Sequence, residues 1–294
     1  MPKTSVTFQI DLNDIPRVEG LLSDYQALPP TPYIRFHAKI DGNSLSIYHG
    51  GKCLIQGKDC RQIAARLGYE VPQEEEEEPK RHRFPLSGQI GSDEVGTGDA
   101  FGPIIVVGAY VEKADLPYLK ELGITDSKLL SDEAILALGP KLINRFDYSA
   151  LTLDNPKYNE VHRTNNLNQI KAKMHNRVLL NLSSRHMQAE VTLDQFCLPT
   201  TYYKYLKGEE KVQTGIVFST KGELAFPAVA LASVIARYSF LRHMEKLSKE
   251  FGEDIPLGAG PNVEEFAKKV MQERGEEVLN AIAKTDFKTF TKIK

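Results

Sequence analysis

Hydrophobic and polar positions alternate in short segments at the start of the chain, with turn-forming residues between them. Within residues 1–70 the pattern predicts strands at 4–10, 33–40, 44–49 and 52–57 and helices at 14–25 and 60–67. Gly42 and Asn43 separate two of the strands, as in a tight β-hairpin. We therefore expect a small α+β unit with helices on one face of its sheet. The other face would carry polar side chains, which suits a solvated surface better than a nucleic-acid platform on this pattern alone.

A highly charged segment at residues 71–87 interrupts the alternation. It holds five consecutive glutamates, Glu74 to Glu78, between two prolines, followed by a basic tetrapeptide at 80–83. Proline and dense charge oppose packing, so a flexible linker is expected here. The predicted organisation is a domain at 1–70, a linker at 71–87 and a larger domain at 88–294.

Strands and helices alternate through the larger domain. The pattern predicts strands at 89–94, 103–111, 149–153, 191–194 and 214–219, a helix from Ser131 to Phe146, long helices at 168–187 and 228–243, and two short helices after residue 261. Ser131 fits the N-cap of its helix because acidic residues follow in the first turn. The polar stretch after residue 153 is predicted to be a loop. The alternation predicts an α/β fold with strands buried on at least one face.

Composition limits the class of protein. The 294 residues are 41% hydrophobic and 26% charged, as is usual for a globular protein. No apolar run approaches the ~20 residues that span a bilayer, and the first residues lead into a strand rather than a signal-peptide core. The three cysteines form no CxxC pair, which argues against a disulfide framework or a zinc site. We expect a cytoplasmic protein that does not bind membranes.

The net charge of −2 argues at first sight against a polyanionic partner. The five glutamates at 74–78 account for this value, since removing their five negative charges from −2 leaves a net charge of +3 for the other residues. Runs of like charge are usually solvated linkers. The rest of the chain is mildly basic, which permits nucleic-acid binding without requiring it.

Acidic side chains lie at or just after the ends of three predicted strands in the larger domain. Asp93 and Glu94 end one strand, Asp194 ends another, and Glu223 follows a third. Ligands of open α/β sheets bind where such strand ends converge. Each acid taken singly is compatible with a capping or surface role, but together they predict a carboxylate cluster beside the glycine-rich loop that follows Glu94.

A carboxylate cluster of this kind implies a metal. Mutual repulsion and burial would raise the pKa values of these acids unless a cation neutralised them. Oxygen ligands without His or Cys favour Mg²⁺ or Mn²⁺ over zinc. Two such ions ~4 Å apart can hold the attacking water and the leaving oxygen of a phosphodiester hydrolysis.

Three motifs resemble those of the type 2 ribonuclease H family. They are Asp93-Glu94-Val95-Gly96-x-Gly98 with Gly102-Pro103, Asp126-Ser127-Lys128, and Ala232-Ser233-Val234-Ile235-Ala236-Arg237. Four features resemble the bacterial ribonuclease HIII branch: the N-terminal extension, Thr97 where HII-type proteins have arginine, Asn168-x-x-Lys171-Ala172-x-x-His175-Asn176, and Asp194-Gln195-Phe196. The resemblance covers residues 88–290.

This resemblance implies a ribonuclease-H-like mixed sheet flanked by helices, preceded by a TATA-binding-protein-like domain that binds the substrate. The four metal-binding acids of the family correspond here to Asp93, Glu94, Asp194 and Glu223, the last being an aspartate in HII-type proteins. Asp93 is expected to bridge both ions, and Glu94 and Asp194 to complete one site each. Glu223 would hold the ion that receives the attacking water.

The implied reaction is endonucleolytic hydrolysis of the RNA strand of an RNA/DNA hybrid, giving 3′-hydroxyl and 5′-phosphate ends. Gly96, Thr97 and Gly98 are expected to contact the RNA 2′-hydroxyl, and Ser127 and Lys128 a phosphate. Thr97 in place of arginine predicts poor cleavage at an isolated ribonucleotide. A monomer without a required protein partner is expected.

Two other functions stay open from the sequence. A different nuclease with a ribonuclease-H-like fold, including an HII-type enzyme, would use the same metal chemistry on another substrate, whereas a non-catalytic protein would only bind nucleic acid. His175, at mid-helix, is interpreted as a packed histidine, and Cys197 as a small buried hydrophobe.

Overall fold

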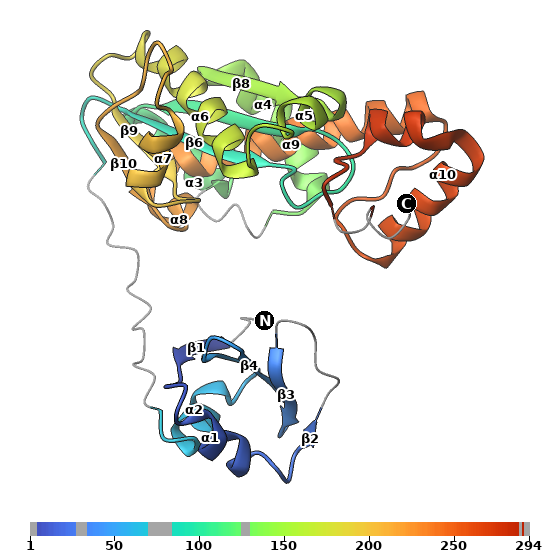
Figure 1. Ribbon diagram of the computed structural model, residues 1–294. Coiled ribbons are helices and arrows are strands. Elements are labelled where there is room, and N and C mark those ends of the chain that lie inside the picture. The colour runs from blue at the N-terminus through green and yellow to red at the C-terminus, as the bar shows by residue number, and fades with distance from the viewer. Residues whose placement is uncertain (1–4, 28–33, 70–83, 125–129, 288–289, 291–294) are drawn as a thin grey trace. The chain divides into compact units, whose positions relative to one another are not determined.

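The computed structural model describes residues 5–27, 34–69, 84–124, 130–287 and 290 (Figure 1). They belong to two compact units, Met1–Glu77 and Glu78–Lys294, and each is described by itself. Most of the segment predicted as a linker lies outside the described residues.

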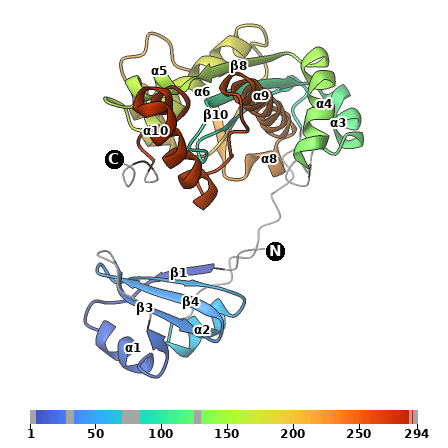
Figure 2. The same ribbon diagram turned by 90° about the vertical axis from the view of Figure 1, so that its right-hand side faces the viewer.

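The N-terminal unit is an antiparallel sheet with two helices on one face (Figure 2). The sheet order is β1-β5-β4-β3-β2, formed by β1 (Ser5–Gln9), β2 (Gln26–Ala27), β3 (Ile34–Ile40), β4 (Asn43–Tyr48) and β5 (Lys52–Gln56). The helices are α1 (Ile15–Leu21) and α2 (Cys60–Arg66). The predicted elements are present, but α1 is shorter than predicted, and the short strand β2 was not predicted. The α+β class expected for this unit is confirmed.

The β3–β4 hairpin turns at Asp41 and Gly42 rather than at Gly42 and Asn43. Both turn residues have positive φ, 47° and 79°, as a two-residue type I′ turn requires. Asn43 already pairs with Ile40 in the sheet, and its buried amide donates to the carbonyls of Ile40 and Asp41 at 3.2 and 3.0 Å. The side chain of Asn43 thus stabilises the turn from within β4.

The core of the N-terminal unit lies between its sheet and its helices. Ile15 and Val18 of α1 and Ile63 of α2 pack with Leu45, Ile47 and Ile55 of the sheet. Side chains at alternating positions along a strand point to opposite faces. Lys39, Lys52 and Gln56, which alternate with core residues, are exposed. This is the polar face expected from the sequence.

The larger unit is built on a mixed sheet of order β10-β9-β6-β7-β8. Its strands are β6 (Gln89–Val95), β7 (Ile104–Val111), β8 (Tyr148–Leu153), β9 (Glu190–Asp194) and β10 (Ile216–Ser219). β6 is parallel to β9 and β9 to β10, whereas β7 is antiparallel to β6 and β8. Ser92 pairs with Leu193 and Ser219 pairs with Asp194, so β6, β9 and β10 end at one edge of the sheet.

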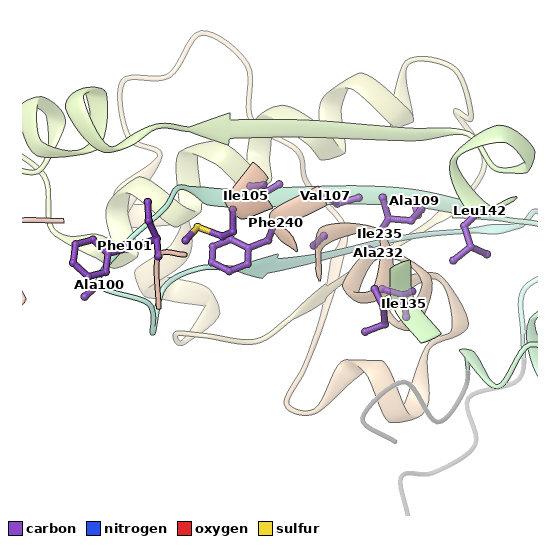
Figure 3. Packing of buried hydrophobic residues seen from close by; sticks show 14 of the residues in the cluster. Ala100, Phe101, Ile105, Val107, Ala109, Ile135, Leu142, Ala232, Ile235 and Phe240 are labelled. Carbon is purple, nitrogen blue, oxygen red and sulfur yellow. The ribbon is translucent and has the colours of Figure 1, made fainter. Parts of the chain in front are cut away.

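Helices cover both faces of this sheet. The long helix α9 (Pro227–Phe251) packs on β6 and β7 with α4 (Asp132–Arg145) behind it, and α6 (Leu167–Ser183) packs on β6, β7 and β8 from the other side. A Cβ on Gly91 would lie 2.2 Å from the backbone nitrogen of Val229, so glycine in β6 allows α9 to lie directly on the strand. Figure 3 shows side chains of β7, α4 and α9 meeting in the resulting core.

Several connections differ from the sequence-based expectation. The stretch predicted as a polar loop contains the helix α5 (Asn155–Val161), whose N-cap Asp154 accepts from the backbone nitrogen of Lys157 at 2.9 Å. Short helical segments at Lys113–Asp115, α3 (Leu116–Glu121), α7 (Pro199–Tyr205) and α8 (Gly222–Ala225) complete the unit. The two helices expected after residue 261 form α10 (Pro261–Ile282), which is broken at Gly275 (φ 87°) and packs beside α5 (Figure 1). Among the helices that the structure describes, none has the length and apolar character to cross a membrane.

Candidate active site

The four acids singled out from the sequence line one cavity at the edge where β6, β9 and β10 end. Asp93 and Glu94 come from β6, Asp194 is the last residue of β9, and Glu223 lies on α8 just after β10. The cavity has a volume of about 430 Å³. Its other lining residues are Val95, Leu130, Asp132, Ile135, Ser233, Val234 and Arg237. The convergence expected from the strand ends is therefore present.

Asp93 lies toward α9, where its carboxylate meets the hydroxyl of Ser233. The backbone nitrogen of Glu94 donates to Asp93 Oδ1 at 2.8 Å. Burial and the nearby carboxylates of Glu94 and Asp194 raise the pKa of Asp93 to about 8. The environment of Asp93 is thus one in which negative charge is unfavourable without a compensating cation.

Glu94, the next residue on β6, points to the other face of the sheet, toward α6. Its Oε1 forms an ion pair with Lys171 Nζ, and its Oε2 lies 2.9 Å from His175 Nε2. Burial opposes ionisation, but the hydrogen bond from His175 and the charge of Lys171 outweigh it and hold the pKa of Glu94 below its usual value. Glu94 is therefore an ionised carboxylate that α6 already neutralises.

Asp194 and Glu223 are joined through a short turn. The backbone nitrogen of Gly222 donates to Asp194 Oδ1 at 2.7 Å. Lys221, just before it, has a left-handed backbone with φ 56°, and this bend starts α8 directly after β10. Glu223, one residue further on, is only 8% exposed. The bend thus brings Glu223 to the same cavity as Asp194.

The loop after Glu94 is held in a defined conformation. Gly96 has φ 87°, and a Cβ there would lie 2.1 Å from the carbonyl oxygen of Pro103. The buried Lys284 donates through Nζ to the carbonyls of Asp99 and Gly102 at 2.7 and 2.5 Å. Thr97 is partly exposed and Gly98 is exposed at the surface of this loop. Ser127 and Lys128, also expected at the substrate, lie outside the described residues.

Comparison with known proteins places this site in a family. The family model described as Ribonuclease HII matches residues 90–290, and one described as a domain of unknown function, DUF3378, matches residues 6–80. The chain is 42% identical to the Ribonuclease HIII of Bacillus subtilis over 86% of its own length and 85% of that protein's. It is 41% identical to the Ribonuclease HIII of Bacillus velezensis, covering 88% and 87% of the two chains.

The chain belongs to the ribonuclease HIII family.

Solved structures agree with this assignment. The crystal structure of Bst-RNase HIII in complex with Mn²⁺ matches with a TM-score of 0.70 and 35% identity, over 99% of this chain and 98% of that one. The ribonuclease H2 of Pyrococcus horikoshii, at 24% identity and a TM-score of 0.58, covers 70% of this chain and 96% of its own, and shares the fold. As a member of the ribonuclease HIII family, the chain is an endoribonuclease, and its ribonuclease-H-like fold is confirmed.

Two pairs of side chains beside the four acids were not assigned a role from the sequence. Lys171 was noted only as part of a motif and His175 was interpreted as a packed histidine, although their spacing of four residues places them on one face of a helix. Asp132 was expected only as a first-turn acid. It forms a bidentate pair with Arg237, at 2.9 and 2.8 Å, on the wall of the cavity. Their separation of 105 residues leaves no local pattern that reveals this contact.

The donor chemistry of the cavity fits a divalent metal. Its acids offer carboxylate oxygens, which hard cations prefer, and the raised pKa of Asp93 reflects negative charge that a cation would relieve. Within the described part of the chain, however, no three His, Cys, Asp or Glu side chains gather closely enough to hold an ion as they stand. Both oxygens of Glu94 already bond to α6, and Asp194 Oδ1 accepts from the backbone nitrogen of Gly222.

Proposed function

We propose that this endoribonuclease hydrolyses the RNA strand of RNA/DNA hybrids within the strand, leaving 3′-hydroxyl and 5′-phosphate ends. The observation that carries the proposal is the meeting of four carboxylates in one cavity at the shared edge of β6, β9 and β10. The ribonuclease HIII relatives support hybrid hydrolysis over the other nuclease activities compatible with this fold.

Asp93, Glu94, Asp194 and Glu223 are the residues that would hold the divalent cations, Mg²⁺ or Mn²⁺. Bound in a pair, such cations supply positive charge that activates a water and stabilises the leaving oxygen. The crystal structure of Bst-RNase HIII in complex with Mn²⁺ supports this choice of ion. Asp93 would contribute to both positions, because its carboxylate interacts with those of Glu94 and Asp194.

Substrate recognition is proposed for the loop that follows β6. The left-handed Gly96 turns this loop, and a Cβ on Gly98 would meet nothing within 4 Å, so the backbone there is open to a ligand. Contact with the 2′-hydroxyl is what distinguishes RNA from DNA at a given position. We assign this contact to Gly96, Thr97 and Gly98, and a phosphate contact to Ser127 and Lys128.

The N-terminal unit is proposed as an additional hybrid-binding domain. The sheet face opposite its helices carries Lys39 and Lys52, both exposed, beside the partly exposed Tyr48. Lysine ammonium groups suit the phosphate backbone, whose contacts provide most of the affinity for nucleic acid. The covering helices leave this face to the substrate.

The test is a cleavage assay with and without Mg²⁺ or Mn²⁺ on three duplexes: an RNA/DNA hybrid, plain DNA, and DNA with one ribonucleotide. We expect metal-dependent cutting of the hybrid RNA strand, no cutting of plain DNA, and poor cutting at the single ribonucleotide because of Thr97. Comparable rates on the hybrid and on the single ribonucleotide would contradict the role given to Thr97.

Asp93→Asn separates catalysis from binding. This substitution keeps the shape of the side chain but removes its charge, so hybrid binding should stay near that of the unmodified chain while cleavage is lost. If the unmodified chain binds the hybrid but does not cleave it with either Mg²⁺ or Mn²⁺, the protein only binds nucleic acid.

A further inference from the structure

Glu94 is held by two buried basic side chains of α6. Lys171 is 7% exposed and His175 is fully buried. Lys171 Nζ pairs with one carboxylate oxygen of Glu94, and His175 Nε2 lies 2.9 Å from the other. Both oxygens of this proposed metal ligand are therefore engaged by groups that carry or can carry positive charge.

Neighbouring groups keep this pair in place. His175 Nδ1 lies 2.7 Å from Ser92 Oγ, and Ser92 Oγ donates to the carbonyl of Val107 at 3.0 Å. The ring of Phe196 stacks on His175, with 5.3 Å between centroids, and lies 4.1 Å from Lys171 Nζ. Ser92 of β6 and the ring of Phe196 thus fix the position of His175, and Phe196 also contacts Lys171.

Glu94 thus lines the cavity with both of its carboxylate oxygens already engaged. A carboxylate whose two oxygens bond to Lys171 and His175 cannot also coordinate an ion at full strength. Lysine carries a compact point charge, which neutralises the carboxylate much as a metal would. Removing the lysine charge leaves Glu94 Oε1 available to another cation, while His175 still engages Oε2.

We propose that Lys171 and His175 form a cation clamp that neutralises Glu94 before metal binds and competes with the metal for this carboxylate. They are positioning residues, since they act through Glu94 and not on the substrate. The inference rests on the proposed function, because it takes Glu94 as a metal ligand. It adds a built-in competitor that limits metal affinity at this site.

Lys171→Met tests the competition, because methionine retains much of the aliphatic stem against Phe196 but lacks the charge. We expect Mn²⁺ to bind this variant more tightly by on the order of tenfold, comparable to the effect of one nearby charge on a carboxylate's affinity for a proton. Isothermal titration calorimetry on the full chain gives the dissociation constant without any assay of turnover. Lys171→Arg keeps a charge and should stay near the unmodified chain.

Lys173→Met is the matched control on the same helix. Lys173 is 43% exposed and pairs with Glu209 at 3.1 Å, so its loss should leave Mn²⁺ affinity unchanged. An equal or weaker affinity for Mn²⁺ in Lys171→Met would overturn the proposal. A shift of the same size in both variants would also overturn it, because the effect would then be one of net charge alone.

The Asp93→Asn variant and a metal-free measurement distinguish this proposal from the proposed function. If the unmodified chain binds Mn²⁺ no better than Asp93→Asn, the metal site itself is refuted and the competition with it. In EDTA, Lys171→Met should lower the melting temperature, and Glu94→Gln in the same chain should restore most of the loss. Additive effects of the two substitutions would refute the clamp even if metal binds.

Discussion

The same three chemical groups meet at two places near the ends of helix α6, and their surroundings differ. The inner cluster joins Glu94 to Lys171 and His175, whose side chains alone are 12%, 8% and 0% exposed. The outer cluster, just beyond the other end of α6, joins Asp147 to Arg185 and His186, with exposed fractions of 37%, 46% and 23%. Each consists of a carboxylate, a long basic side chain and a histidine.

The outer cluster has the features of a structural connection. Arg185 makes a bidentate pair with Asp147 at 2.9 Å, and His186 contacts Asp147 at 2.7 Å and stacks on Tyr110. It joins the end of α6 to the start of β8, and water screens its charges. The inner cluster is buried beside the cavity that holds Asp93, so its charges act strongly on one another. The two clusters contain similar residue types, and they differ in burial and in the acids that lie next to them.

The largest expected difference is in hydrolysis. Glu94→Gln should reduce hybrid cleavage by about a thousandfold or more, since single removals of essential active-site groups cost this much in other enzymes. Asp147→Asn should leave the rate within about twofold, because surface substitutions of this kind have small effects. Steady-state cleavage of one hybrid by both variants measures the contrast. Equal losses in the two variants would break the comparison.

Stability should differ in the same direction. Lys171→Met leaves the Glu94 carboxylate buried and without its lysine partner, which costs about 3 kcal/mol of unfolding free energy, whereas Arg185→Met removes a surface pair worth about 1 kcal/mol or less. Urea unfolding in EDTA, followed by circular dichroism, gives both values. A larger loss for Arg185→Met would show that the outer cluster is the more important connection.

The response of the two clusters to salt should also differ, but by less than their stability. Ionic strength screens exposed pairs, with a Debye length of about 10 Å at 0.1 M and 3 Å at 1 M, but has little access to buried ones. The destabilisation caused by Arg185→Met should therefore shrink at 1 M salt, and that of Lys171→Met should change little. Repeating the urea series at both concentrations tests this. If the losses of unfolding free energy in the two variants shrink equally at 1 M salt, burial does not explain the difference between the clusters.

The smallest effect concerns acid stability at the outer cluster. Burial opposes ionisation of Asp147, but hydrogen bonds from Arg185 and His186 outweigh it and hold the pKa of Asp147 below its usual 3.8. A lowered pKa contributes stability above the unfolded value, and this contribution is lost as pH falls through the folded one. Asp147→Asn should therefore flatten the decline in melting temperature below pH 3.8. An unchanged decline would mean that Asp147 gains nothing from its partners.

Local patterns predicted the two strands that carry Asp93, Glu94 and Asp194, but not the short helix α8 that carries Glu223. The strands predicted at 89–94 and 191–194 are present as β6 and β9, and Ser131 caps its helix as expected, accepting from the backbone nitrogen of Ala134. The helix α5 was missed because its polar composition resembles a loop. The Asp154 cap and packing against α10 stabilise this helix, and the packing against α10 cannot be recognised from the local sequence.

The sequence by itself determined that Asp93 and Glu94 lie at the end of one strand and face opposite sides of it, because side chains alternate along any strand. It also determined the spacing of Lys171 and His175, since residues four apart share a helix face. Only the tertiary structure decided that β9 and β10 lie parallel to β6, so that Asp194 and Glu223 reach Asp93, and that α6 presents its two basic residues to Glu94. These contacts depend on packing between segments that are distant in the sequence, such as Thr192 and Ile90, which are 102 residues apart, and no local pattern encodes them.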